Sequence, residues 1–220
     1  RLSSHFFFTE SLNDSNGYLR ARNIEALGET KSPKVIGFLE KALNDPFALV
    51  QNNAIEALGK INTDVSREVI IRSLATQDLT LLAIAAGSLA GDEKIKSDKK
   101  KSEMLSQKII ESYKKIKPPI DVEAQINIFD ALGDLKSMSS LDFLQPFLGD
   151  TDRVVAKGAA KNLEKISGGQ FCISDEKKFH IIDGVGFTKL ISGKPSCVIE
   201  TNKGTIEIDL FTEEAPLTVM

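Results

Sequence analysis

Hydrophobic residues recur along this chain in a pattern that is 31 residues long. Residues 24–28 and 55–59 both read Ile-Glu-Ala-Leu-Gly. Allowing one 12-residue insertion after the third unit, five leucines keep the same register: Leu27, Leu58, Leu89, Leu132 and Leu163. Repetition at this period is typical of supersecondary units that stack on one another.

Apolar residues also precede each register leucine by three and by eight positions. Three positions before stand Ile24, Ile55, Ala86, Phe129 and Ala160, and eight before stand Leu19, Val50, Leu81, Ala124 and Val155. Successive helical residues are rotated by about 100°, so these positions share one side of a helix. Each register leucine therefore belongs to an amphipathic helix.

A polar turn separates this helix from an earlier apolar segment in each unit. Its marker is an aspartate thirteen residues before the leucine, at Asp14, Asp45 and Asp150, with Thr76 in its place in the third unit. The pattern predicts that Asp45 caps a helix whose first residue is Pro46, and that Ser32-Pro33 begins a helix at about 32–44. We expect Gly28 and Gly59 to cap helix C-termini.

The fold class predicted is mainly α: a solenoid of about five helix pairs over residues 1–167, followed by a small β segment. One pair cannot bury both its faces alone, whereas stacked pairs share a continuous core. Residues 44–59, with their Asp-Pro and Asn-Ala-Ile-Glu-Ala-Leu-Gly, resemble the HEAT-like repeat family. Ala90 departs from the family pattern, which has glycine there. The resemblance implies a scaffold that binds other proteins.

The side of each second helix opposite its apolar stripe is polar and mildly acidic. Its residues are Arg22, Glu25, Asn53, Glu56, Asn127 and Asp130. If the second helices line the concave surface, as in the HEAT-like family, these six form a candidate partner-binding groove. A solvated helix surface is the alternative interpretation, and the carboxylates give no indication of acid–base catalysis.

The insertion, residues 92–103, is rich in lysine. Residues 91–117 hold nine lysines against five acidic residues, whereas the whole chain has a net charge of −3. One interpretation is a loop that contacts an acidic partner or phosphate. The alternative is a solvated loop and helix surface.

After Gly168 the helical period stops and short β-like segments follow. Residues 168–195 are interpreted as a linker with short strands. Residues 197–201 and 205–210 flank a compact Asn-Lys-Gly turn, which predicts a β-hairpin with one buried and one wet face. Because a lone hairpin is marginal in water, we expect a sheet of three or four strands with residues 171–192, or exchange of the hairpin between chains to give a homo-oligomer.

Residues 198–219 carry a second resemblance. Val198, Thr201, Gly204, the alternation Ile206-Glu207-Ile208-Asp209-Leu210-Phe211 and then Ala215-Pro216 look like the start of a cyclophilin-type peptidyl-prolyl isomerase, truncated here at residues 196–220. The resemblance implies isomerisation of proline-containing client proteins or peptides by a longer protein. That chemistry rotates an amide bond across a barrier of about 18–20 kcal/mol and needs no cofactor or metal.

The resemblance places the family's catalytic arginine after Met220. No residue of this chain then carries over as catalytic or cofactor-binding, and residues 1–220 are expected to be inactive by themselves. The beginning at Arg1 and the end within a patterned stretch indicate a piece of a longer protein.

Composition excludes several classes of function. Hydrophobic residues make up 41% and charged residues 27% of the 220, as in ordinary globular proteins. The net charge argues against nucleic-acid binding, and the uncharged run at 79–91 is too short for a membrane span. With His5, His180, Cys172 and Cys197 as the only histidines and cysteines, a zinc site is not expected, and whether the cysteines are bridged stays open.

The leading hypothesis is a HEAT-like scaffold joined to an isomerase that assists protein folding. The alternative is a non-enzymatic scaffold for protein–protein interaction. A third reading, a HEAT-like DNA glycosylase or phycobilin lyase, is disfavoured: the glycosylase needs a basic groove with aromatic residues, and the chain has acidic residues there and no tryptophan. The fusion suggests a bacterial protein, in the cytoplasm or the cell envelope.

Overall fold

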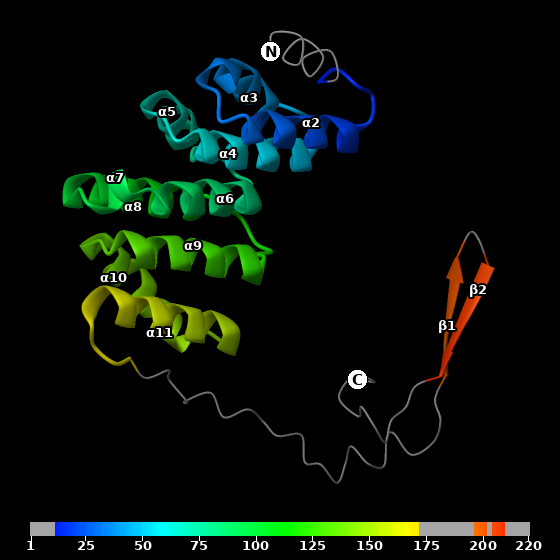
Figure 1. The fold of residues 1–220 in the computed structure, drawn as a ribbon. Helices are drawn as coiled ribbons and strands as arrows, with labels where there is room; N and C mark the ends of the chain where they lie inside the picture. Colours follow the sequence, from blue (N-terminus) through cyan, green and yellow to red (C-terminus); the bar gives the residue numbers. More distant parts are fainter. Residues whose placement is uncertain (1–11, 172–195, 202–203, 210–220) are drawn as a thin grey trace. The chain divides into compact units, whose positions relative to one another are not determined.

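The computed structural model describes residues 12–171, 196–201 and 204–209. The chain divides into two compact units, Arg1–Ser174 and Asp175–Met220. In the described part, the first unit is helical and the second holds two strands (Figure 1).

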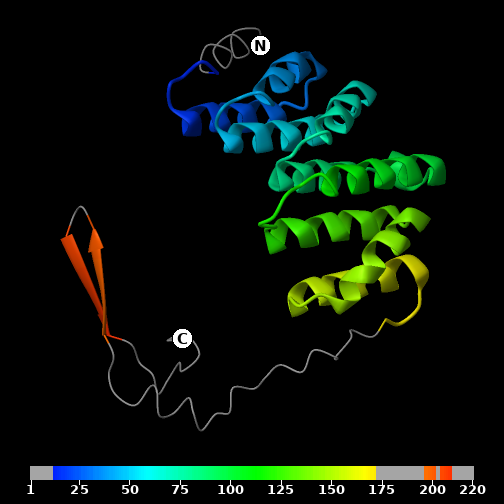
Figure 2. The same cartoon turned by 180° about the vertical axis from the view of Figure 1, so that it is seen from behind.

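The second helix of each repeat forms one continuous layer in the first unit. These helices are α2 (Gly17–Glu29), α4 (Ala48–Ile61), α6 (Leu79–Ala90), α9 (Val122–Leu135) and α11 (Arg153–Ser167). Each packs on the next, α2 on α4, α4 on α6, α6 on α9 and α9 on α11 (Figures 1 and 2).

The first helices are shorter or broken. They comprise the 3₁₀ turn η1 (Pro33–Val35) with α3 (Ile36–Ala42), then α5 (Asp64–Ser73), α7 (Glu93–Lys96) with α8 (Lys99–Tyr113), and α10 (Met138–Leu144) with the 3₁₀ turn η2 (Gln145–Gly149). The first helix expected in the repeat of α2 would fall in residues 1–11, which lie outside the described residues. The structure thus confirms the mainly helical fold class and its solenoid of helix pairs.

The predicted apolar stripe forms the core. All five register leucines and the residues three positions before them are buried. Eight positions before, Val50, Leu81, Ala124 and Val155 are buried, but Leu19 is 50% exposed. Leu19 differs because α2 is the first described helix of the stack, with no described helix on its other side.

The glycines predicted as C-caps have a different role. Helix α2 continues to Glu29, and α4 continues to Ile61 and is capped by Asn62 in the left-handed conformation. Gly28 instead lies where α4 approaches α2 closely, because a β-carbon added to it would stand 2.6 Å from the β-carbon of Ala57. Gly59 meets Ser88 in the same way.

The turn aspartates precede the N-cap residues of the second helices by two positions. Asp45 is not the N-cap that was predicted: α4 begins at Ala48, and the Asp45 carboxylate accepts a hydrogen bond from the backbone N–H of Phe47 at 2.8 Å. Asp14 and Asp150 accept equivalent bonds from residues two positions on. Thr76 does the same through its hydroxyl, so it replaces the aspartate without changing the turn. Ser32 is an N-cap, as predicted.

The insertion, residues 92–103, is largely helical, which agrees with the interpretation as a helix surface better than with a loop. It forms α7 and the first turns of α8, with Asp92 and Asp98 as their N-caps. Ile95 anchors α7 because its side chain is buried in the core.

The second unit contains the predicted hairpin. Strand β1 (Ser196–Thr201) pairs antiparallel with β2 (Gly204–Asp209), with Val198 opposite Glu207 and Ile199 opposite Ile206. Val198, Thr205 and Glu207 are exposed, so one face is wet as expected. The further strands expected at residues 171–192 fall almost entirely outside the described residues, as do Cys172 and the side chain of Cys197. Among the described helices, none is long and apolar enough to cross a membrane.

Close packing at Gly28 yields the first testable prediction. We expect Gly28→Ala to lower the free energy of unfolding by about 1–3 kcal/mol, because the new methyl group overlaps the backbone and side chain of Ala57. Gly37→Ala in α3 is the matched control, since nothing lies within 4 Å of the added atom. There the helix propensity of alanine favours folding by up to about 1 kcal/mol. Urea denaturation measures both, and equal effects would contradict the close approach.

Candidate protein-binding groove

Side chains on the outer face of the second helices bridge neighbouring repeats. Lys60 pairs with Glu29 at 2.6 Å, Lys161 pairs with Asp130 at 2.9 Å, and Lys165 pairs with Asp134. The partners in each pair are 31 residues apart. This separation equals the repeat length, so stacking brings the same face of successive helices together.

The series of ion pairs between neighbouring second helices is interrupted at α6. Where α4 has Asn53 and Glu56, and α9 has Asn127 and Asp130, the corresponding residues of α6 are Ile84 and Gly87. Short side chains on α6 leave a groove of about 710 Å³ between its neighbours. We call it the α6 groove. Its base comprises Ala83, Ile84, Gly87 and Ser88 of α6, and its sides comprise Glu56 and Lys60 of α4 with Asn127, Asp130 and Asp134 of α9.

The ion pairs leave one carboxylate of the groove without a partner. Asp130 accepts hydrogen bonds from Lys161 and from Asn162, the latter at 2.8 Å. Lys60 is held by Glu29, whose hydrogen bond raises the pKa of Lys60, with the fields of Glu56 and Glu25 adding to the effect. Within residues 12–171, Glu56 feels the field of Lys60 but forms neither a hydrogen bond nor an ion pair, and its side chain is exposed to solvent.

A buried ion pair lies at the end of the α6 groove. Arg67 of α5 donates from Nε to Asp92 and from a terminal nitrogen to Asp64. The Arg67 and Asp92 side chains are 10% and 7% exposed. Burial by itself raises the pKa of Asp92, but the hydrogen bonds from Arg67 and from the backbone N–H of Lys94 outweigh it and hold this pKa below its ordinary value.

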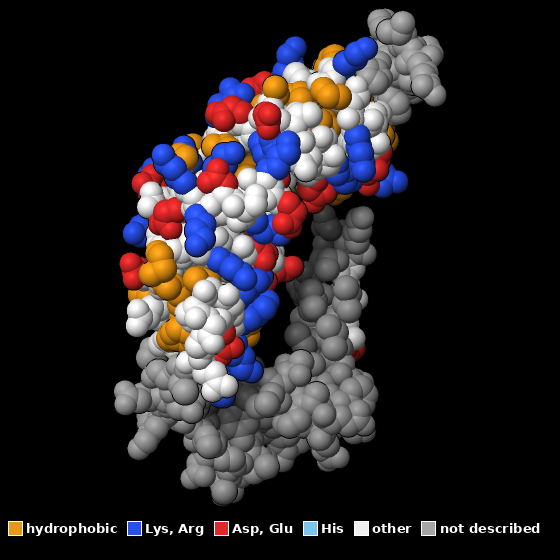
Figure 3. Space-filling view, turned by 60° about the vertical axis from the view of Figure 1, so that its left-hand side comes forward, with side chains coloured by type: hydrophobic (Ala, Val, Ile, Leu, Met, Phe, Trp, Pro, Cys, Tyr) orange, Lys and Arg blue, Asp and Glu red, His pale blue; other side chains and the backbone are white. Residues whose placement is uncertain are grey.

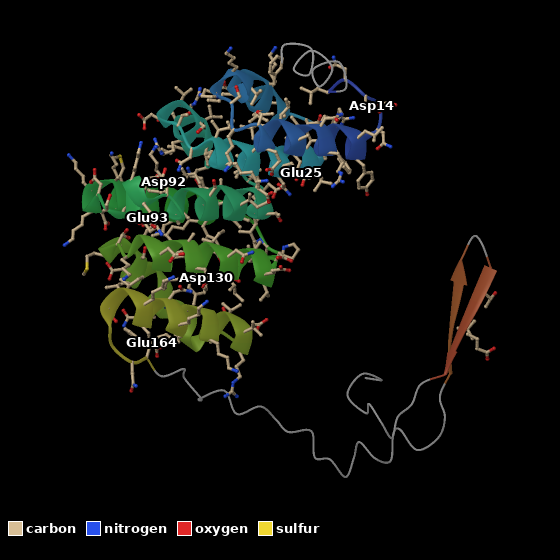
Figure 4. The ribbon with its side chains drawn as sticks, in the orientation of Figure 1. Asp14, Glu25, Asp92, Glu93, Asp130 and Glu164 are labelled. Carbon is tan, nitrogen blue, oxygen red and sulfur yellow. The ribbon has the colours of Figure 1, made fainter. Side chains whose placement is uncertain are left out.

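The structure brings together only half of the six residues singled out from sequence. Glu56, Asn127 and Asp130 line the α6 groove. Arg22 and Glu25 pair with each other at 3.3 Å on α2, and α4 and α6 separate Glu25 from Asp130 (Figure 4).

The sixth residue, Asn53, binds the scaffold itself. Its side-chain amide donates to the backbone carbonyl of Ala21 at 3.0 Å and so ties α4 to α2.

Sequence reasoning missed Lys60, Asp134 and the base of the α6 groove. Lys60 and Asp134 lie two residues after a register leucine, so extending the same face by one helical turn finds them. Ile84 and Gly87 occupy the columns already used in the other repeats. The base of the α6 groove could therefore have been found from the sequence, because the third repeat has uncharged Gly87 where its neighbours have a carboxylate. Among the described residues, no group of three or more histidines, cysteines and carboxylates has the geometry of a metal site.

Comparisons with known proteins agree with this architecture. Residues 7–90 match the family model of HEAT repeats. A chain of the complex of CpcE and CpcF of phycocyanin lyase from Nostoc sp. PCC7120 superposes with a TM-score of 0.55 at 22% identity, covering 74% of this chain and 64% of that one. An engineered protein has a TM-score of 0.48 at 22% identity, covering 74% of this chain and 78% of that one. No curated protein sequence matches the chain.

The helical unit is a solenoid of helix pairs whose first repeats match the HEAT-repeat family. The family model covers the first repeats, and the same register of helices continues through α11. The likeness to the phycocyanin lyase chain concerns the fold alone. This chain spans just under two thirds of that chain's length.

The buried ion pair of Arg67 and Asp92 leads to the second prediction. We expect Arg67→Met to lower the free energy of unfolding by about 3–5 kcal/mol at neutral pH, because Asp92 is left buried without its cation. Arg72→Met, on the same helix, is the control. The Arg72–Glu40 pair is exposed, so its loss costs less than about 1 kcal/mol.

The pH dependence of this difference follows from the lowered pKa of Asp92. The stability supplied by the ionised pair is complete above the unfolded pKa of aspartate, about 4, and is lost as the pH falls through the lower folded-state pKa. The difference in the free energy of unfolding between wild type and Arg67→Met therefore becomes smaller as the pH falls from 7 to about 3. A gap that is constant with pH, measured by urea titration, would be incompatible with an ionised Asp92 in the folded chain.

Proposed function

We propose that the HEAT-repeat solenoid is a protein-interaction scaffold whose α6 groove holds a basic segment of a partner. The observation that carries the proposal is Glu56, an unpaired carboxylate beside an uncharged groove base. Electrostatic complementarity between partners mainly governs specificity and the rate of association. A lysine or arginine of the partner would supply the cation that α6 lacks.

The dimensions and composition of the α6 groove support a peptide segment as the occupant. A cavity of about 710 Å³ accommodates several side chains, and Ala83, Ile84 and Gly87 present apolar or backbone surface to them. Apolar contact at the centre with charges at the rim is the usual anatomy of an interface. Asp130 and Asp134, which pair with Lys161 and Lys165 of α11, continue the charged rim along α9.

The fold relationship also supports protein partners. HEAT-repeat arrays present extended surfaces built from successive repeats. The similar phycocyanin lyase chain is itself part of a complex of two proteins, CpcE and CpcF. For this chain, a protein partner fits that precedent better than a small-molecule substrate, because the groove is open and bordered by charge.

A peptide-binding experiment tests the proposal and is the third prediction. The probe is a fluorescein-labelled peptide of alternating lysine and leucine, about 12 residues long, titrated with the chain at low ionic strength. We expect Glu56→Lys to weaken binding about tenfold or more, because the one free carboxylate is replaced by a repelling cation. The control is Glu111→Lys on α8, an exposed carboxylate outside the α6 groove, which should leave affinity within about twofold. Equal losses in both variants would refute the assignment of the groove.

Prolyl isomerisation is the second candidate function, and the hairpin is the observation that favours it. Strands β1 and β2 form where the isomerase-like motif predicts the first two barrel strands. In this hypothesis the solenoid holds a proline-containing client and thereby raises its local concentration near the catalytic barrel. The comparisons support the repeat scaffold and give this second candidate no support of their own.

A protease-coupled proline-isomerisation assay tests the second candidate and is the fourth prediction. We expect residues 1–220 to give no acceleration over the uncatalysed rate, because the resemblance assigns none of their residues a catalytic role. A chain extended past Met220 is the comparison. Acceleration by residues 1–220 alone would overturn the expectation that they are inactive.

A further inference from the structure

A second cavity, of about 440 Å³, lies between α5, α7 and α8, and we call it the α8 pocket. Its rim carries Lys94 of α7 with Lys101 and Lys108 of α8, and Ile71, Ile95 and Met104 contribute apolar surface. Four cations, these lysines and Arg67, stand against only two carboxylates, Asp64 and Glu68. Its charge is thus opposite to that of the α6 groove and of the chain as a whole.

The residues of α8 that line this pocket form a single stripe. Lys101, Met104, Leu105 and Lys108 follow the spacing i, i+3, i+4, i+7, which places them on one side of the helix. The two lysines are therefore about two turns apart, with apolar side chains between them. Met104 is 50% exposed, so this apolar surface is accessible.

Two of the lysines form no ion pair among the described residues, although the field of Lys94 reaches Asp92. Within residues 12–171, neither Lys94 nor Lys108 forms an ion pair, and Lys101 has only a loose one with Asp98 at 3.6 Å. Lysine and arginine side chains stand beside hydrophobic ones on this side of the solenoid, the left-hand side of Figure 1 brought forward in Figure 3.

Arg67 adds a buried cation to the lining of the α8 pocket. Its side chain is nine-tenths buried and lines both the α8 pocket and the α6 groove. Nε and Nη1 are engaged by Asp92 and Asp64, but buried Nη2 has no hydrogen-bond partner. A buried donor without a partner costs free energy comparable to a lost hydrogen bond. The guanidinium therefore keeps part of its positive charge uncompensated beside the lysines of the α8 pocket.

We propose that the α8 pocket docks an acidic, amphipathic peptide segment of a partner protein, with carboxylates on the lysines and an apolar residue against Met104. The apolar surface between the lysines favours such a segment over a free phosphate, which would use the cations alone. The pocket is separate from the α6 groove and selects the opposite charge. The solenoid can therefore hold two different segments, or two partners, at once.

The test uses a fluorescein-labelled peptide of about 14 residues with glutamates seven positions apart on either side of leucine, titrated against the intact chain. We expect the double variant Lys101→Glu/Lys108→Glu to weaken binding at least about tenfold. Met104→Ser should weaken it about threefold, because less apolar surface is buried. Lys157→Glu, an exposed lysine on α11, is the matched control and should stay within about twofold.

Replacement of the leucines of the peptide by serine separates a docking pocket from general attraction to lysines. The proposal requires this peptide to bind at least about tenfold more weakly than the original. Equal binding of the two peptides, or unchanged binding of the original peptide by the double variant, overturns the proposal. It is also overturned if the chain binds anionic phospholipid vesicles more strongly than it binds the peptide.

Folding of the double variant is checked by circular dichroism. The substitution Lys101→Glu lies in the first turn of α8, where a carboxylate favours the helix. Lys101→Gln/Lys108→Gln provides a second variant that removes the charges without reversing them, with a smaller loss of affinity expected. The test of the α6 groove uses a basic peptide and other residues, so either proposal can fail without the other.

Discussion

The solenoid depends on the close approach of each second helix to the next. The residue after each register leucine meets the residue before the following one, as Gly28 meets Ala57, Gly59 meets Ser88 and Gly133 meets Asn162. Helices that pack at this distance exclude water from the leucine stripe. The buried residues form one large cluster from α2 to α9 and a second, smaller one of α9, α10 and α11. In the third repeat alanine, Ala90, follows the register leucine in place of glycine, and this residue is also buried.

The same stacking determines the electrostatics of the outer face. Because neighbouring helices lie in register, equivalent positions of adjacent repeats become contact positions, and lysines pair with carboxylates one repeat earlier in the chain. Isolated pairs of this exposed kind contribute little to stability. Their consequence is local: they neutralise most charges of the face and leave Glu56 as the unpaired one beside α6.

The third and fourth repeats concentrate the features that distinguish this solenoid from a regular array. Small residues on α6 open a groove, and the insertion that forms α7 and the start of α8 supplies a cluster of lysines. Arg67 stands between the two cavities, and its pairing with Asp92 ties α5 to the start of the insertion. One buried guanidinium thus belongs to the lining of both cavities.

Much of the architecture was predictable from the spacing of Leu27, Leu58, Leu89, Leu132 and Leu163, because a period of 31 with helical substructure permits few arrangements other than stacked pairs. The hairpin was predictable for a similarly local reason, the alternation of apolar and polar residues around a short turn. Half of the candidate surface was also predictable, since Glu56, Asn127 and Asp130 follow from helix geometry alone.

What only the tertiary structure decided depends on distances between repeats. Sequence identified Gly28 and Gly59 as helix ends, whereas their role is to admit the next helix, and no local pattern reports how closely two helices pack. It likewise could not show that Asn53 binds the carbonyl of Ala21, or that Arg67 and Asp92, 25 residues apart, share a buried site. Local pattern determined which side of each helix is apolar, and the stacking of one repeat on another decided which polar residues remained free to bind a partner.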